Sequence, residues 1–478
     1  MTRTPWKPSH ASLDRRSAIV GTLATATWAA LPPVASATGA FRPEDFGARG
    51  DGQTDDTSAF VMLSRAVQRA GGGRIVLSPK TYMVGRQTPG APPQYRYEPT
   101  PLIELEGLPL GITIEGNGGT LRANPGLRFG SFDEHGTGLK PQLPFYDGRA
   151  LATPYRFMIR ISRSLGPVLI QDVELDGNIE AMILGGEWGD TGWQIPMSGI
   201  GLFDNIGSET VRRVYLHNHG QDGLIIDGAN TEVGASRKIE LLRSFHNGRQ
   251  GCSIVGGNNY RFTQCEFSHT GRSAIASAPG AGVDLEAEGG KQVRDISFSF
   301  CTFDNNFGAG MVADSGPTEG VAFFACRFVG RTNWSAWPSK PRFRFGNCEF
   351  AGGLVRAYAS DEPALASQFT DCFFADYDPR SGFPCYGSDG SVPIVDLGGS
   401  FEAGRNVAFV RCLFDLRHQG KLPWTGGTIY DSVKMRQRSK ALAYPRGVYR
   451  GVSEIEGPAI LASTTVEGTL LLNGEPIN

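Results

Sequence analysis

The chain lacks a dominant charge, a long hydrophobic run in its main body, and the ligand spacing of a zinc site. Its 478 residues carry 46 Lys and Arg against 48 Asp and Glu, so the formal net charge is −2. A nucleic-acid-binding domain usually shows a basic patch, and none is visible, so we expect no nucleic-acid partner. After the first 37 residues no segment is long enough to cross a bilayer, which predicts no membrane span. No Cys and His spacing is typical of structural zinc.

What the chain has in quantity is turn residues. It contains 64 glycines and 30 prolines, while 40% of its residues are hydrophobic. Turn residues this frequent are typical of many short strands that each end in a bend. The hydrophobic content is enough to fill a long, narrow core.

Six copies of Cys-x-Phe give the strongest pattern, and successive cysteines lie 36, 25, 22, 24 and 40 residues apart. A period of 22 to 25 residues is that of one coil of a strand solenoid, and we interpret the longer gaps as a coil plus an insertion. Residues two apart point to the same side of a strand, so stacking predicts an internal ladder of Cys over Cys and Phe over Phe. We interpret these six cysteines as small buried hydrophobes, not disulfide partners. The six begin at Cys265, Cys301, Cys326, Cys348, Cys372 and Cys412.

Residues 1–37 have the pattern of an export signal. Arg15 and Arg16 precede a short apolar run, and Ala35-Ser36-Ala37 is a cleavage site of the A-x-A type. The arginine pair resembles that of a twin-arginine signal. A general secretory signal and a retained membrane anchor are the alternatives. The pattern predicts a periplasmic or secreted protein.

The next segment carries a long motif. Residues 45–57 read DFGARGDGQTDDT, a helical pattern follows with apolar Phe60, Leu63 and Val67, and residues 71–84 read GGGRIVLSPKTYMV. This motif resembles the opening of the pectate-lyase-like superfamily of right-handed parallel β-helices, which includes polysaccharide lyases, hydrolases, epimerases and tailspike-type enzymes. The resemblance implies an all-β, single-stranded right-handed parallel β-helix with an N-terminal amphipathic helix as its cap, and an association with carbohydrate. We expect the aspartates of the motif to be turn and helix-cap acceptors.

Aligning the middle of the chain on its glycines predicts one outward-facing acidic column. In this alignment the inward positions are nearly all apolar, and acidic side chains occupy four of the six outward positions of the column. Whether the insertion at 274–281 shifts this register is left open. The outward column contains Asp176, Phe203, Asp227, Val255, Glu286 and Asp314, and its neighbour contains Glu174, Gly201, Ile225, Ser253, Asp284 and Val312.

The candidate catalytic residues come from this column: Asp284, Glu286 and Asp314, with Asp227 in support. Two carboxylates about 5 to 5.5 Å apart suit a retaining glycosidase, and about 6.5 to 9.5 Å an inverting one. Strand geometry gives both ranges, so the stereochemistry stays open. Acidic neighbours would raise the pKa of one carboxyl, which general-acid chemistry needs. The alternatives are a solvated acidic ladder and a structural cation site.

Several residues near this column are candidates for substrate binding. Arg249 and Arg272 occupy the same repeat position before a strand, where they would clamp an acidic sugar or move a proton in β-elimination; the alternative is a pair of surface arginines at a turn. His246 is one of several histidines that recur near these turns. A hydrogen bond to the backbone is the alternative to acid–base chemistry for it. The remaining candidates are Glu288 beside the acidic column and the aromatic pair Trp188 and Trp193.

We therefore predict an exported enzyme that cleaves glycosidic bonds in a polysaccharide, with hydrolysis by paired carboxylates favoured and no cofactor required. The first alternative is a Ca²⁺-assisted lyase or epimerase on a uronate polymer, with Asp284, Glu286 and Asp314 as the metal ligands. The second is a non-catalytic glycan-binding solenoid. The motifs of polygalacturonate hydrolases and the Asp-Pro-His-Glu of alginate epimerases are absent, so neither reaction carries over. The oligomeric state stays open. We expect a signal at 1–37, cap and first coils at 38–100, the β-helix at 101–420, and C-terminal coils and cap at 421–478.

Overall fold

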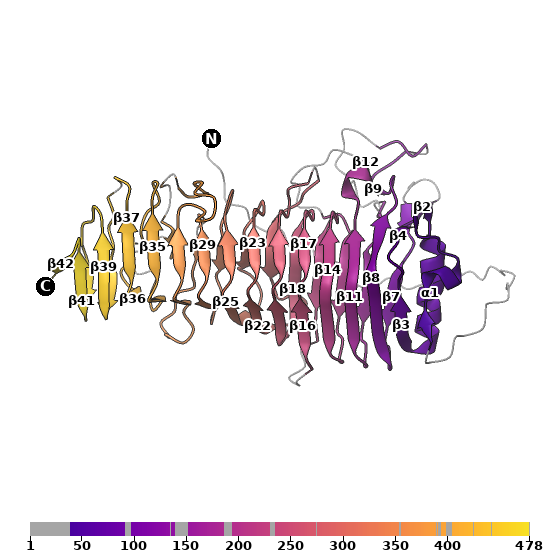
Figure 1. Cartoon of the computed structure of the whole chain (residues 1–478), viewed down its shortest axis with the longest axis horizontal. Helices are drawn as coiled ribbons and strands as arrows, with labels where there is room; N and C mark the ends of the chain where they lie inside the picture. Colours follow the sequence, from indigo (N-terminus) through magenta and orange to yellow (C-terminus); the bar gives the residue numbers. More distant parts are fainter. Residues whose placement is uncertain are drawn as a thin grey trace. The chain divides into compact units, whose positions relative to one another are not determined.

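The structure is a computed structural model. It describes residues 39–90, 97–133, 135–138, 152–185, 194–229, 235–273, 275–352, 355–388, 390, 393–397, 404–423, 425–440 and 442–477. Within these residues the chain winds into coils whose strands pair in parallel with the strands of the coils before and after (Figure 1). The prediction of a parallel β-helix is therefore confirmed. In the described part of the chain, no helix is both long and apolar enough to cross a membrane.

Each coil contributes one strand to a first ladder, which we name sheet I. Its inward positions are the apolar series Ile200, Leu224, Cys252, Val283 and Met311, which pair in that order and are fully buried. The strands of sheet I are β7 (Ile103–Glu106), β10 (Phe157–Ser162), β13 (Ser198–Phe203), β15 (Asp222–Asp227), β18 (Gln250–Asn258), β21 (Ala281–Leu285), β24 (Met311–Ala313), β27 (Ala336–Pro338), β30 (Val355–Arg356) and β33 (Val395–Asp396).

The rest of each coil forms a second ladder, sheet II, which bends once per coil. At the bend a residue adopts a positive φ, as Gln264 (53°) and Asn347 (53°) do, and a Cys-x-Phe motif follows directly. The strands of sheet II are β8 (Gly111–Ala123), β11 (Val168–Asp176), β14 (Glu209–His217), β16 (Arg237–Glu240), β17 (Arg243–Phe245), β19 (Tyr260–Thr263), β20 (Glu266–Ser268), β22 (Val293–Ser299), β23 (Thr302–Asp304), β25 (Thr318–Phe324), β26 (Arg327–Val329), β28 (Arg344–Gly346), β29 (Glu349–Ala351), β31 (Gln368–Thr370), β32 (Phe373–Ala375), β34 (Ala408–Val410), β35 (Leu413–Leu416), β36 (Ile429–Asp431), β37 (Lys434–Gln437), β38 (Gly447–Arg450), β39 (Val452–Glu456), β40 (Thr464–Val466) and β41 (Thr469–Leu472).

The Cys-x-Phe ladder is confirmed, including its two long gaps. The motif phenylalanines pair coil over coil from Phe267 to Phe414, and their rings stack with centroids 4.5 to 5.5 Å apart. All eight cysteines are free and buried. The gaps of 36 and 40 residues each span one coil with an insertion, since Phe303 follows Phe267 directly in the ladder and Phe414 follows Phe374.

The segment that carries the superfamily motif forms the first elements of the solenoid. Helix α1 (Thr57–Ala70) packs its buried Phe60 edge-on against Tyr82, with ring centroids 5.4 Å apart, and Gly71 ends it with φ 73°. Its aspartates accept hydrogen bonds as expected: Asp55 takes the amide of Thr57 at 3.0 Å, and Asp56 takes the amide of Arg49 at 2.8 Å. Figure 1 shows α1 beside β3 and β7, at the end where the coils begin.

The remaining elements lie at the two ends and in the insertions. β41 pairs antiparallel with β42, the last strand of the chain that the structure describes. These elements are β1 (Ala40–Phe41), β2 (Asp51–Asp55), β3 (Gly72–Val76), β4 (Thr81–Val84), the pairs β5 (Gln87–Pro89) with β6 (Tyr97–Pro99) and β9 (Arg128–Gly130) with β12 (Ile183–Gly185), β42 (Glu475–Ile477), and the 3₁₀ turns η1 (Pro43–Phe46) and η2 (Ile179–Ala181).

Candidate functional site

The outward face of sheet I carries the predicted neighbour of the acidic column. Ile225, Ser253, Asp284 and Val312 pair in that order across β15, β18, β21 and β24, as the glycine alignment predicted. The insertion does not displace the acidic segment, because β21 begins at Ala281 and contains Asp284. The neighbouring column is therefore correct from Ile225 to Val312, whereas Glu286 and Asp314 of the acidic column lie just beyond the ends of β21 and β24.

The predicted placement was wrong at the upstream end of both columns. Glu174 and Asp176 belong to β11 of sheet II, where Glu174 pairs with Tyr215 and Asp176 with His217. Val255 was also misplaced, since Asp227 pairs with Gly256 after a register shift in β18. Strands of both sheets show the same alternation of apolar and polar residues, so alternation alone could not assign β11 to a sheet.

Asp284 is a buried carboxylate, with 8% of the residue exposed. The side-chain amide of Gln250, one coil back, donates to Asp284 Oδ2 at 2.7 Å. Burial raises the pKa of Asp284 well above its usual value, and the nearby charge of Glu286 raises it further, while Arg249 acts in the opposite direction. Asp284 therefore holds a proton in a pH range where an exposed aspartate is ionised.

The charges of Glu286 and Asp314 act on Asp284, and that of Glu286 acts on Glu288; we name these four residues the acidic cluster. The amides of Glu286 and Glu288 donate to Ile254 and Val255 at 3.1 and 2.9 Å, which fixes this segment along the preceding coil. The hydroxyl of Ser315 donates to Glu286 Oε1. Burial and the charge of Glu286 raise the pKa of both Glu288 and Asp314. The predicted catalytic carboxylates are therefore electrostatic neighbours.

Asp227 lies at the margin of this cluster and has a basic partner of its own. Lys291 Nζ lies 2.6 Å from Asp227 Oδ1 and 2.6 Å from Asp204 Oδ1. Asp227 also acts on Glu288, whose pKa its charge raises. An aspartate that already shares a lysine suits a supporting role better than proton transfer.

Arg249 lies beside the acidic cluster but is held by another carboxylate. Asp222, fully buried, accepts two hydrogen bonds from Arg249 and one from the hydroxyl of Ser253 at 2.8 Å. Burial disfavours the arginine charge, yet Asp222 and then Asp284 raise the pKa of Arg249 overall. The guanidinium is thus a fixed positive charge next to Asp284. The sequence analysis missed Asp222 and Gln250 as site residues, although their paired positions before the outward column carried the signal.

The other predicted binding residues do not join this site. Arg272 donates to the backbone carbonyls of Asn305 and Asn306 and to Thr332, and it contacts neither Asp222 nor Ser253, so the structure does not bring it together with Arg249. His246 packs against His269 beyond the end of β17, with ring centroids 4.9 Å apart. Trp188 and Trp193 lie outside the described residues.

The fit of the acidic cluster to calcium can be judged from its side chains. Among the described residues, no three His, Cys, Asp or Glu side chains converge closely enough to form a metal-ligand set. Asp284, Glu286 and Asp314 therefore do not fit a preformed calcium site in this arrangement. The calcium dependence of the alternative function stays a prediction.

A groove of about 780 Å³ lies on sheet II, and Tyr215, Arg243 and Phe300 form part of its walls. It contains none of the predicted catalytic residues.

Comparisons with known proteins concern the fold. No family model matches the chain, and no curated protein does. Among solved structures, the A-module of the Azotobacter vinelandii mannuronan C-5 epimerase AlgE4 is 15% identical, with a TM-score of 0.42 over 89% of this chain and 99% of that one. The Agl-KA catalytic domain is 15% identical, with a TM-score of 0.44 over 92% and 69%. The tailspike gp49 of Acinetobacter baumannii bacteriophage Fri1, a capsular polysaccharide depolymerase, is 14% identical, with a TM-score of 0.39 over 88% and 63%.

These neighbours are right-handed parallel β-helix proteins, the architecture that the resemblance to the pectate-lyase-like superfamily implied. At such identities the similarity transfers no activity to this chain.

Proposed function

We propose that this protein is an enzyme that cleaves glycosidic bonds in a polysaccharide, and that the acidic cluster on sheet I performs the reaction. The observation that carries the proposal is the environment of Asp284, a buried carboxyl with a raised pKa beside Glu286 and a fixed arginine. Strongly shifted carboxyls are expensive to maintain and concentrate at functional sites. A purely solvated acidic ladder would not bury one of its members.

Asp284 is proposed as the general acid. Its raised pKa keeps the proton that the leaving glycosidic oxygen needs, while Gln250 orients the carboxyl. Glu286 projects from the same edge and is the candidate base or nucleophile, with the hydroxyl of Ser315 fixing one of its oxygens. Residues two apart on a strand lie about 6.6 Å apart and residues on adjacent coils about 4.8 Å apart, so the geometry allows inversion or retention.

A polymer is the proposed substrate because the site lies on a continuous strand surface. β15, β18, β21 and β24 present their outward residues side by side, at about 4.8 Å per coil. A saccharide chain laid across the coils would meet several of these positions at once. Export to the periplasm or the medium, proposed from the signal pattern at 1–37, would bring the enzyme to such a substrate.

The lyase alternative finds less support in the site. β-Elimination by Arg249 would require the guanidinium to give up its proton, whereas Asp222 and Asp284 raise its pKa. A guanidinium is effectively always charged even without such partners. Arg249 is better suited to hold a negative charge near Asp284 than to act as a base.

The test is turnover of a panel of neutral and uronate polysaccharides, with and without EDTA. New reducing ends without an unsaturated product, and unaffected by EDTA, would support hydrolysis by the acidic cluster. An unsaturated, ultraviolet-absorbing product that EDTA abolishes would establish the calcium-assisted lyase instead. Binding of a polymer without turnover under any condition would establish the non-catalytic solenoid.

A further inference from the structure

A pocket of about 370 Å³ lies on sheet II, at the edge where the coils turn toward sheet I. Five successive coils contribute to it through residues at or just beyond the ends of β8, β11, β14, β17 and β20. Its volume is within the range of small-molecule sites. We name it the arginine pocket; its polar lining includes Arg122, Asn178, Asn218, His246, Arg272 and Ser273.

The two arginines of this pocket differ in how their charges are balanced. Arg122 Nε lies 3.3 Å from Asp176 Oδ2, so a carboxylate neutralises it. Arg272 donates to the carbonyl of Asn305 at 3.0 Å, the carbonyl of Asn306 at 3.4 Å and the hydroxyl of Thr332 at 2.6 Å, all of which are uncharged. Within the described residues, no carboxylate forms an ion pair with Arg272, and burial is the one cause that shifts its pKa.

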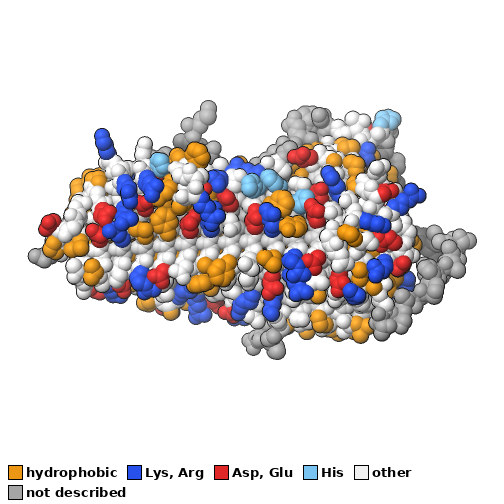
Figure 2. Space-filling view, viewed as in Figure 1, with side chains coloured by type: hydrophobic (Ala, Val, Ile, Leu, Met, Phe, Trp, Pro, Cys, Tyr) orange, Lys and Arg blue, Asp and Glu red, His pale blue; other side chains and the backbone are white. Residues whose placement is uncertain are grey.

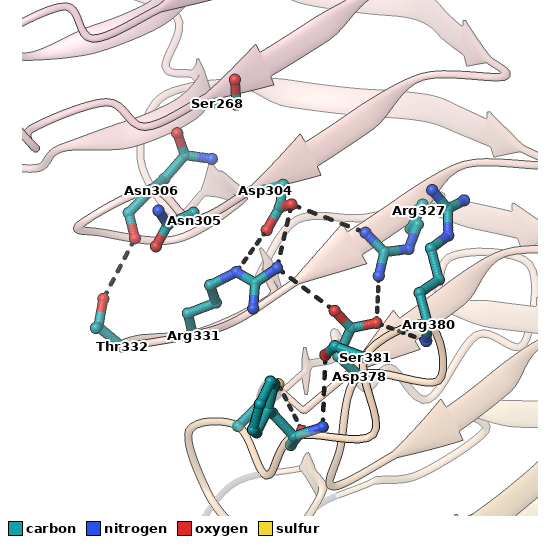
Figure 3. Close-up of polar contacts among 12 residues, drawn as sticks. Ser268, Asp304, Asn305, Asn306, Arg327, Arg331, Thr332, Asp378, Arg380 and Ser381 are labelled. Atoms are coloured by element: carbon teal, nitrogen blue, oxygen red, sulfur yellow. Dashed lines mark hydrogen bonds and ion pairs between the residues drawn. The ribbon is translucent and has the colours of Figure 1, made fainter.

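The lack of a counter-charge on Arg272 is unusual for this edge of the solenoid. A few coils further along, Arg331 and Arg327 share the carboxylates of Asp304 and Asp378, with Arg327 Nη2 2.6 Å from Asp378 Oδ1 (Figure 3). Both arginines of that network therefore have carboxylate partners. Arg272 is half-buried, and burial lowers its pKa with no opposing charge to compensate. A partly buried guanidinium of this kind favours an anionic ligand.

The rest of the lining suits a ligand that is also rich in hydroxyl groups. His246 belongs to a group of histidines with His217 and His269 at this edge, where Figure 2 shows imidazole side chains gathered. Burial, then the neighbouring imidazoles, lowers the pKa of His246, so its ring is neutral and offers both a donor and an acceptor. The side-chain amide nitrogens of Asn178 and Asn218 donate to Ala123, Asp176 and His217, so these two residues offer their Oδ1 atoms as acceptors for sugar hydroxyls.

We propose that the arginine pocket binds an acidic sugar residue, with the carboxylate of a uronate on Arg272 and the sugar hydroxyls on His246 and the two asparagines. The choice of a sugar as ligand rests on the proposed polysaccharide-cleaving function, while the choice of an anion rests on Arg272 alone. The pocket shares no lining residue with the acidic cluster. It would therefore select acidic polymers without taking part in the chemistry.

The test is calorimetric titration of the full chain carrying Asp284→Asn, which prevents turnover during the measurement. The probes are trigalacturonate, trimannuronate and triglucuronate, with maltotriose as the neutral comparison. Arg272→Gln should weaken binding of the acidic trimer about 10-fold. Arg65→Gln, which removes an exposed arginine of α1, is the matched control and should leave it unchanged. Glu180→Gln removes a negative charge from the rim and should tighten binding about twofold.

The result that would overturn the proposal is equal affinity for maltotriose, no binding of any acidic trimer, or an Arg272→Gln variant that binds like Arg65→Gln. The gain expected from Glu180→Gln guards against misfolding, because a damaged pocket would not bind more tightly. Turnover by the unmodified protein is measured separately, so failure of the proposed reaction and failure of this pocket give different results.

Discussion

The side chain of Gln250 links two neighbouring coils at the carboxyl of Asp284. Its Nε2 donates to Asp284 Oδ2 at 2.7 Å, while its Oε1 accepts the amide of Ala281 at 3.1 Å. The second contact fixes the orientation of the side-chain amide, so the donor faces the carboxyl. The geometry of the proposed acid is thus set by the coil that precedes it.

Replacing Gln250 with alanine should change the pH dependence of activity. The amide donor stabilises the ionised form of Asp284, so its loss should raise the carboxyl pKa further. If Asp284 must be protonated to act, the alkaline limb of kcat/KM should move to higher pH in Gln250→Ala. A limb that moves to lower pH, or stays in place, would contradict the role of Asp284 as acid.

Asp284→Asn should stabilise the fold at neutral pH. The folded-state pKa of Asp284 is raised, so the folded protein holds this proton at pH values where the unfolded chain has lost it, and stability falls as pH rises through this window. The gain in unfolding free energy should be about 1.4 kcal/mol for each unit of the shift. It should disappear at pH values below the ordinary pKa of aspartate. Denaturant titrations of both proteins at acidic and neutral pH measure the difference, and a variant less stable than the original at neutral pH would contradict the assignment.

A buried ion pair away from the site should matter for folding only. Arg237 Nη1 lies 2.6 Å from Glu209 Oε2, and both side chains are almost fully buried. Arg237→Met leaves the carboxylate of Glu209 without its ion partner, and we expect a loss of about 3 to 5 kcal/mol in unfolding free energy. The double variant Arg237→Met/Glu209→Gln should recover part of that loss. If Arg237→Met and Arg237→Met/Glu209→Gln are equally stable, the unpaired charge of Glu209 is not the cause of the lost stability.

The cysteine ladder should be chemically silent in the native protein. All eight thiols are free and buried, so a reagent in solution does not reach them while the coils stay packed. A disulfide reagent that releases a coloured product when it reacts with a thiolate should therefore label none of these cysteines in native buffer. It should label all of them in denaturant. Rapid native labelling would show that the ladder opens, which would remove the basis for treating these cysteines as core residues.

The sequence predicted the fold well because the repeat is carried by inward residues. Cys265 and Phe267 recur at positions that must stack, so the ladder and its two insertions could be found without coordinates. The position of Asp284 followed because it shares β21 with that core. Glu174 and Asp176 were misassigned because β11 alternates in the same way as the strands of sheet I.

Contacts between side chains of different coils were beyond the sequence. Arg249 and Arg272 occupy similar turns, yet Asp222 pairs with Arg249, whereas Arg272 donates to uncharged groups. This difference depends on the insertion after Arg272 and on which neighbours surround each guanidinium. Neither is visible in the repeat pattern.

The most direct test of the central claim compares Asp284→Asn with Asp172→Asn on whichever polysaccharide the panel identifies. Asp172 is paired with Arg213 on sheet II and has a positive φ of 56°, which asparagine tolerates, so this variant changes an aspartate outside the site. We predict that Asp284→Asn lowers the rate at which reducing ends appear about 100-fold or more, while Asp172→Asn keeps the original rate. Full activity of Asp284→Asn would contradict the assignment of the acidic cluster as the catalytic site.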